Sequence, residues 1–466
     1  MSKDRFKDFD DEEIKIILDF ENTVLKGRDQ FFDVDELEII IDYYLEVSDL
    51  IPLERAVEYA EHLYPNSTEI RLRRAHLLIV KQHYHSALRI IQELRQEEPD
   101  NTDIAYSLGV VYSAMKQSEK AITYFLEAAK DGWQLGRIYA NIAEEYFTLH
   151  DYDNAIRYYQ LALDTDSYDE STLYNYLDTA FECNMVEETA TYIRSFLDEH
   201  PYSAEGWHCL GNCYYYLTLY EKAIDSYDFA LAIDKTLLMA YTDKACAQEE
   251  MGRTGEAVTT LIQQAEIVDN PAPIYSSIAY IYDRNNNHAT ALAYFQKALD
   301  LSPDDPNIMS ALALCLLHSN DTQQALATIK RALKQETPNA LVFNVAAKIY
   351  DQIGNIDMAR DYYERMLDTD GCSEDMCQQY IDFLYRNQFY NEVIDFAQES
   401  LNILPKDGFY SAYLVAAYYH TNRYNSARQH LDNADLPLLS ILCPEMPGNP
   451  LFSTLFPSTA DPQQHK

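Results

Sequence analysis

The sequence contains few glycines, few basic residues and no long apolar run. Only 12 of its 466 residues are glycine, and none of them forms a Gly-x-Gly-x-x-Gly motif, a phosphate-binding loop or a Gly-x-Ser-x-Gly nucleophile elbow. No apolar stretch approaches the ~20 residues that a membrane-spanning helix requires. The segment from Met1 to Glu13 lacks the apolar core of a secretory signal. We therefore expect no nucleotide-binding or hydrolase motif, no membrane insertion and, by default, a cytoplasmic location.

Positive charge is scarce relative to negative charge. The chain has 36 lysine and arginine residues against 76 aspartate and glutamate residues, a formal net charge of −40 at pH 7. Such a surface repels phosphate backbones and anionic membranes. We expect no nucleic-acid partner, and the charge favours a basic protein or peptide as a ligand.

The eight cysteines are scattered rather than densely spaced, which is typical of free thiols in a reducing compartment. His208, Cys209, Cys213 and Cys246 could be arranged around a metal. However, metal sites usually pair their ligands at short spacings on turns, and cysteine is a common small buried residue. We favour packing for these cysteines, and we expect no metal site, no cofactor and no catalytic residue.

A 34-residue period runs through most of the chain. If the first repeat begins at Val34, twelve repeats fill residues 34–441 without an insertion, and alanine occupies position twenty in nine of them. Position eight is small in eight repeats, position eleven is tyrosine in seven, and position twenty-four is apolar in all. Position fifteen is polar or glycine throughout, as expected where paired helices are joined by a turn. Proline at position thirty-two of five repeats predicts helix ends there.

These columns predict pairs of packed helices, because small residues let two backbones approach and bulky residues fill the remaining gaps. The sixth repeat carries the whole pattern, with Trp207, Leu210, Gly211 and Tyr214 on its first helix and Ala223, Tyr227 and Ala230 on its second. The pattern resembles the tetratricopeptide repeat (TPR) family. The segment from Phe31 to Tyr44 is similar to that of uncharacterised cytoplasmic bacterial members. The resemblance implies an all-α, right-handed superhelical α-solenoid of about twelve helix-turn-helix units.

The fifth and eleventh repeats depart from the pattern, so we expect altered helix separation there. Thr189 and Val393 replace the alanine of position twenty, and Leu177 and Ile381 occupy the small position eight.

The repeats divide the chain into three parts. Residues 1–33 are an acidic segment in which residues 10–26 are expected to form an amphipathic capping helix, because a repeat cannot bury its own outer face. Residues 34–441 are the twelve repeats. Residues 442–466 are proline-rich, and we expect a flexible tail.

The resemblance implies that positions two, five, nine and twelve of each repeat point into a concave groove. Aromatic rings there would supply contact area, amides would bind an extended backbone, and carboxylates would favour a basic ligand. The alternative is that many of the 39 tyrosines only pack between helices. The candidate groove residues are Tyr106, Asn141, Glu144, Tyr174, Asn175, Asp178, His208, Asn212, Tyr215, Tyr280, Asn344 and Gln378.

Three classes of function are compatible with these features. The first is a non-catalytic protein- or peptide-binding scaffold, because the repeats leave no room for an inserted enzyme domain. The second is a regulatory or assembly subunit of a larger complex that binds a basic partner through its acidic surface. An enzyme or metal-binding protein is the least favoured class. The sequence leaves the oligomeric state open.

Overall fold

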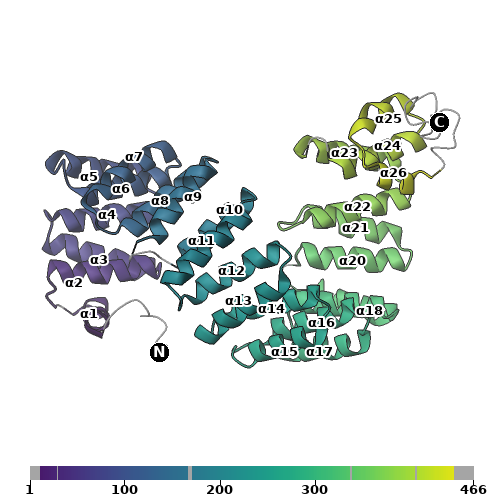
Figure 1. Ribbon diagram of the computed structural model, residues 1–466, viewed down its shortest axis with the longest axis horizontal. Helices are drawn as coiled ribbons and strands as arrows, with labels where there is room; N and C mark the ends of the chain where they lie inside the picture. Colours follow the sequence, from purple (N-terminus) through teal and green to yellow (C-terminus); the bar gives the residue numbers. More distant parts are fainter. Residues whose placement is uncertain (1–10, 29, 166–169, 336–337, 405–406, 445–466) are drawn as a thin grey trace. The chain divides into compact units, whose positions relative to one another are not determined.

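The computed structural model describes residues 11–28, 30–165, 170–335, 338–404 and 407–444 (Figure 1). In these ranges every regular element is a helix, which confirms the predicted all-α solenoid class. The chain divides into two compact units, Met1–Arg253 and Thr254–Lys466, and the division falls between the two helices of repeat seven.

The first unit begins with a helix that precedes the repeats and continues with the first helices of repeats one to seven and the second helices of repeats one to six. The α-helices of this unit are Asp11–Asn22 (α1), Val34–Glu46 (α2), Leu50–Leu63 (α3), Thr68–Val80 (α4), Tyr84–Glu97 (α5), Thr102–Ala114 (α6), Ser118–Ala128 (α7), Leu135–Thr148 (α8), Tyr152–Leu163 (α9), Ser171–Glu182 (α10), Val186–Glu199 (α11), Ala204–Tyr216 (α12), Tyr220–Ile233 (α13) and Leu238–Glu250 (α14).

The second unit begins with the second helix of repeat seven and ends with a short helix at the end of repeat twelve. Its α-helices are Thr254–Ala265 (α15), Ala272–Arg284 (α16), His288–Leu301 (α17), Pro306–His318 (α18), Thr322–Ala332 (α19), Ala340–Gln352 (α20), Ile356–Leu367 (α21), Glu374–Arg386 (α22), Tyr390–Ile403 (α23), Gly408–His420 (α24), Tyr424–His430 (α25) and Leu436–Leu442 (α26).

The turn at repeat position fifteen has the same backbone conformation in all twelve repeats. Its φ lies between 55° and 78°, in the left-handed region, at Ser48, Gln82, Lys116, His150, Asn184, Thr218, Gly252, Asn286, Asn320, Gly354, Gln388 and Asn422. This conformation ends the first helix, because the next N–H donates back to the carbonyl of position eleven, as from Gln117 to Tyr112 at 2.9 Å. The polar or glycine residues predicted at this turn are therefore confirmed.

The small residue at position eight lies against the aromatic residue at position twenty-four of the same repeat. A Cβ added to Gly109 would lie 2.5 Å from the ring of Phe125, and one added to Gly211 would lie 2.4 Å from the ring of Tyr227. Phe125 and Tyr227 are buried. The predicted close approach of the paired helices is therefore confirmed in repeats three and six.

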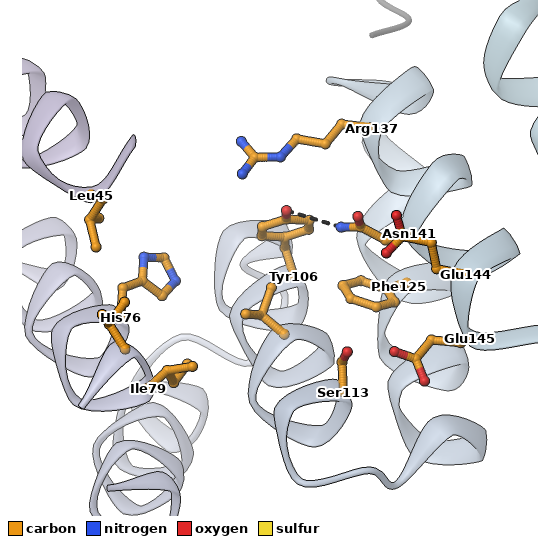
Figure 2. Close-up of a pocket in the computed structure, with 12 residues that line it drawn as sticks. Leu45, His76, Ile79, Tyr106, Ser113, Phe125, Arg137, Asn141, Glu144 and Glu145 are labelled. Atoms are coloured by element: carbon orange, nitrogen blue, oxygen red, sulfur yellow. Dashed lines mark hydrogen bonds between the residues drawn. The ribbon is translucent and has the colours of Figure 1, made fainter. Parts of the chain in front are cut away.

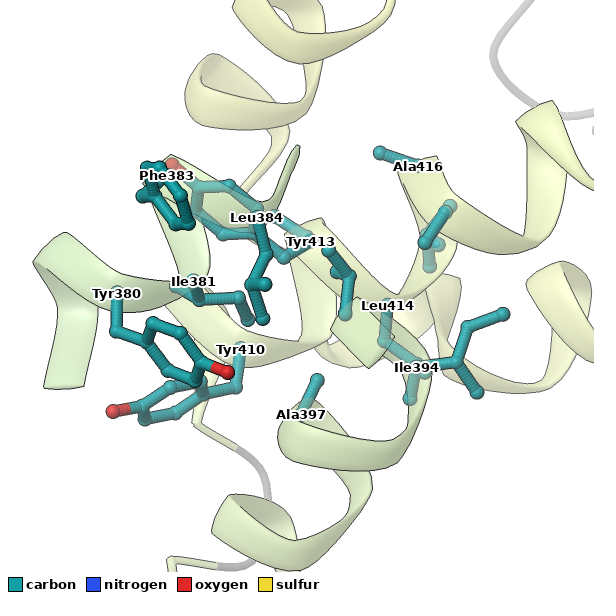
Figure 3. Close-up of a cluster of buried hydrophobic side chains, with 14 of the residues drawn as sticks. Tyr380, Ile381, Phe383, Leu384, Ile394, Ala397, Tyr410, Tyr413, Leu414 and Ala416 are labelled. Atoms are coloured by element: carbon teal, nitrogen blue, oxygen red, sulfur yellow. The ribbon is translucent and has the colours of Figure 1, made fainter. Parts of the chain in front are cut away.

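Repeats five and eleven pack differently, as their sequences predict. In repeat eleven the sizes are reversed, with Ile381 at position eight and Ala397 at position twenty-four, both fully buried. The paired helices of repeats five and eleven have fewer close backbone contacts than those of repeats three and eight. Figure 3 shows the core around Ile381, to which Tyr380 and Phe383 of α22 and Tyr410 and Tyr413 of α24 contribute.

Both ends of the array are covered by short helices. Ile17 and Phe20 of α1 are fully buried against the first repeat, as predicted for a capping helix. Asp33 and Glu36 form a capping box at the start of α2. At the other end, α26 packs on α24 and buries Leu439. Residues 445–466 of the predicted proline-rich tail lie outside the described residues.

We expect Gly211→Leu to lower the stability of the first unit by about 1–3 kcal/mol, because its side chain would displace the buried ring of Tyr227. The midpoint of chemical denaturation measures the loss. Gly255→Ala on α15 is the control, since a Cβ there meets no atom within 4 Å. An unchanged midpoint for Gly211→Leu would contradict the packing described here.

Candidate functional site

Four successive first helices of the first unit, α2, α4, α6 and α8, line two adjoining cavities of about 330 and 640 Å³. We call the two cavities together the α2–α8 groove. They share Leu45, His76, Tyr106 and Arg137, and Figure 2 shows the smaller one. First helices therefore supply most of this groove, as the family resemblance implies.

Aromatic rings held by polar contacts form the centre of the groove. The ring of Tyr106 packs on Phe125 with a centroid separation of 5.6 Å. The Asn141 amide donates a hydrogen bond of 3.1 Å to the Tyr106 hydroxyl (Figure 2). The Arg137 guanidinium lies 5.6 Å from the same ring, a cation–π distance. Trp133, which is 60% exposed, lines the larger cavity and offers a ring to a ligand.

The walls of the groove are acidic. Two arginines, Arg73 and Arg137, are outnumbered by seven carboxyl groups, those of Glu38, Asp42, Glu46, Glu69, Asp103, Glu144 and Glu145. Arg73 is paired with Asp42, because its guanidinium donates hydrogen bonds of 2.8 Å to both carboxylate oxygens. Negative charge thus exceeds positive charge on the groove walls.

Desolvation in the groove shifts the pKa values of its titratable groups. It raises the pKa of Glu38 against the opposing effect of Arg73. Desolvation, together with the neighbouring Glu145, raises the pKa of Glu144. Burial, followed by the charges of the two groove arginines, lowers the pKa of His76 to about 4, so its imidazole is neutral at neutral pH. A bound cation would relieve the crowding of these carboxylates.

A separate cavity of about 240 Å³ lies further along the first unit, and we call it the α10–α14 pocket. Its lining includes Phe181, Asn212, Tyr215, Tyr216 and Asp243. The ring of Phe181 stacks on Tyr216 at 4.9 Å, and Tyr227 donates a hydrogen bond of 2.8 Å to Asn212. The α10–α14 pocket is smaller than the α2–α8 groove and is also lined by aromatic and acidic side chains.

Many predicted groove residues bind each other across consecutive repeats. The hydroxyl of Tyr174 lies 3.3 Å from Nδ1 of His208, and Nε2 of His208 lies 2.7 Å from Asp243. His208 is 1% exposed, whereas the Asp243 side chain is 38% exposed, so this Tyr174–His208–Asp243 chain is buried at its centre and reaches solvent at Asp243. Asn175 similarly donates to Glu144 at 3.4 Å. These contacts join residues 31 to 35 positions apart, so they connect neighbouring repeats.

The other predicted residues line neither the α2–α8 groove nor the α10–α14 pocket. Asp178 is exposed on α10, and Tyr280 of α16 packs edge-on against Phe295. Asn344 of α20 is 4% exposed and donates to Gln379 at 3.0 Å, and its Oδ1 has no hydrogen-bond partner among the described residues. Gln378 donates to Glu374 at 3.3 Å. Tyr280, Asn344 and Gln378 belong to the second unit, whereas the other nine candidates belong to the first.

Three residues that line the α2–α8 groove are not among the candidates predicted from the sequence. Arg137 stands at repeat position two, one of the four columns implied to face a groove, and Arg73 stands at position six. Trp133 precedes α8 in the loop after α7. Arg137 could have been found from its column. Trp133 lies in a loop before α8, outside the four columns, so the columns do not indicate it.

Sequence profiles described as tetratricopeptide repeat match residues 72–135, 136–169, 242–306, 284–349 and 341–370. The match to residues 136–169 coincides with the fourth repeat of the register above. The chain contains tetratricopeptide repeats. Within its described ranges, no helix of this repeat protein combines the length and the apolarity needed to cross a bilayer.

The chain is similar to bacterial and eukaryotic proteins. Some are named for their tetratricopeptide repeats and others as subunits of a complex. TPR repeat-containing protein YpiA of Bacillus subtilis is 20% identical over 76% of this chain and 92% of its own length. Anaphase-promoting complex subunit 3 of Schizosaccharomyces pombe is 21% identical over 63% of this chain, and the match spans 50% of that protein. The solved APC/C hetero-tetramer Cut9-Hcn1 is 15% identical over 83% of this chain and 90% of the solved one, with a TM-score of 0.36.

We expect His208→Ala to destabilise the first unit by about 1–3 kcal/mol, because it removes the group that joins Tyr174 to Asp243 in a buried site. Thermal or chemical denaturation measures the change. His85→Ala, at an exposed position, should shift stability by less than about 0.5 kcal/mol. Equal midpoints for the two variants would show that the buried chain does not stabilise the stack.

Proposed function

We propose that this tetratricopeptide repeat protein is a non-catalytic scaffold that holds a basic protein or peptide in the α2–α8 groove. The observation that carries the proposal is the combination of an aromatic centre with seven wall carboxylates and two arginines, one of which is paired with Asp42. In this proposal the protein is located in the cytoplasm. It catalyses no reaction and binds no nucleic acid.

The groove offers each kind of contact that an extended basic peptide needs. The exposed ring of Trp133 and the ring of Tyr106 can pack on aliphatic parts of lysine or arginine side chains, and they can bind the cations directly. Glu38, Asp103 and Glu144 have pKa values raised by desolvation, so a ligand cation would replace lost hydration. These groups lie on packed helices, and little conformational entropy is lost when a ligand binds such a surface.

The contacts between repeats prepare the groove for binding. The hydrogen bonds from Asn141 to Tyr106 and from Arg73 to Asp42 each join neighbouring first helices. They fix the side chains before a ligand arrives, so the affinity depends on complementarity rather than on reorganisation.

The second candidate function is a subunit of a larger assembly that binds through the acidic outer surface. Two observations favour it: the net charge of −40 and the likeness to a protein named as subunit 3 of the anaphase-promoting complex. In this case the partner would contact second helices, and the α2–α8 groove would remain open. The two candidates therefore predict different responses to groove substitutions.

Affinity capture from native lysate separates the candidates when the bait carries Trp133→Ala with Glu144→Gln. Both side chains are exposed, so the variant should keep its unfolding midpoint. We expect it to lose at least one specific basic partner, with binding weakened about tenfold or more once that partner is purified. Because the attraction is electrostatic, higher salt should weaken the wild-type complex as well.

The matched control is Tyr202→Ala with Glu119→Gln, which changes one exposed aromatic and one exposed acidic residue outside the groove. It should keep every partner of the wild type. Identical partner lists for groove variant and wild type would exclude the groove as the binding site. If those shared partners were lost at high salt, the result would favour binding through the acidic outer surface.

A further inference from the structure

A cluster of side chains that can bind a metal lies in the second unit, whereas the α2–α8 groove belongs to the first. Asp283 is on α16, His288 begins α17 and Cys315 is on α18, so the three come from repeats eight and nine. One ligand atom from each lies within 4.8 Å of the other two. We call these three residues the Asp283 cluster. It is the one group of this kind found among the described residues.

The backbone holds the Asp283 cluster in place. The chain turns between α16 and α17 at Asn286, whose φ is 58°, and the Asn286 N–H donates to the carbonyl of Asp283 at 2.9 Å. This turn sets Nδ1 of His288 at 2.8 Å from Oδ1 of Asp283. Cys315 is fully buried in the middle of the next first helix. The ligand atoms are thus positioned by packed helices and one short turn.

A second histidine orients the carboxylate from its other side. Nδ1 of His318 lies 2.7 Å from Oδ2 of Asp283, leaving Oδ1 directed toward His288. His318 is on α18, three residues after Cys315, so both lie on the same face of that helix. A hydrogen bond to the second oxygen of a ligating carboxylate is a common outer contact of metal sites, and it fixes the ligand's direction.

We propose that Asp283, His288 and Cys315 bind a divalent transition metal of the zinc type, with His318 as the residue that positions Asp283. One carboxylate oxygen, one imidazole nitrogen and one sulfur are ligands that zinc accepts, and three protein ligands leave a fourth position open. The side chains of His288 and His318 are 26% and 46% exposed, so a metal can enter from solvent.

Metal binding requires modest rearrangement and one deprotonation. Ligand atoms around tetrahedral zinc lie roughly 3–4 Å apart, so the cluster must adjust by about 1 Å or less, which the part-exposed ring of His288 permits. Burial, and then the Asp283 carboxylate, raises the pKa of the Cys315 thiol to about 12. A metal must therefore displace the thiol proton to solvent, and the charge of the ion then offsets the negative charges of the thiolate and the carboxylate.

The bound ion would connect three helices of two repeats. Neighbouring repeats are otherwise held by side-chain packing and hydrogen bonds, and a ligand that binds only the folded state stabilises that state. The inference does not depend on the proposed groove function, because all its residues are in the second unit.

Cobalt titration of the chelator-treated full chain tests the proposal. We expect about one equivalent of Co²⁺ to bind and to produce the near-ultraviolet absorbance of a thiolate–cobalt bond, with Zn²⁺ displacing it. Cys315→Ala should abolish that absorbance, and His288→Ala should weaken binding by about tenfold or more. Metal should also raise the unfolding midpoint of the wild type but not that of Cys315→Ala.

Cys377→Ala is the matched control, because Cys377 lies 3.7 Å from Cys372 and is the other candidate source of a thiolate signal. It should leave cobalt binding unchanged. His288→Ala keeps the test informative if Cys315→Ala fails to fold, since His288 is part-exposed. No cobalt binding to the wild type, or absorbance lost in Cys377→Ala but kept in Cys315→Ala, would overturn the proposal.

Discussion

The packing of a large side chain from the second helix against a small residue on the first helix is the contact on which most of the helix pairs depend. Where glycine occupies the small position, as at Gly211, even one added carbon would overlap the facing ring of Tyr227. A helix pair built this way still exposes one face, and it buries that face against the next pair. The repeat interval, the turn and the groove all follow from this arrangement.

The same stacking explains why polar residues on the first helices both form hydrogen bonds between repeats and line cavities. Since first helices lie side by side, a polar side chain on one can reach a residue 31 to 35 positions away on the next, as from Tyr174 to His208 and from Arg73 to Asp42. These bonds stabilise the stack and leave a surface whose remaining charge is mostly negative. In the proposed function, a basic ligand would use the side chains that repeat-to-repeat bonding leaves available.

Most of the fold could be predicted because it is periodic. The left-handed turn at position fifteen, the close approach at Gly211 and the Asp33 capping box each follow from local residue types. The site was predicted less completely. The columns led to Tyr106 and Glu144, but the Asp283 cluster joins residues 5 and 32 positions apart. Neither spacing matches a metal motif, so only the packed helices bring those side chains together.

The central claim is that the partner lies on first helices of the first unit. Hydrogen–deuterium exchange of the purified complex, compared with the protein alone, tests it most directly. The account predicts slower exchange upon binding in α4, α6 and α8, with α5 and α7 unchanged. Protection confined to second helices, with α4, α6 and α8 exchanging as in the protein alone, would contradict it.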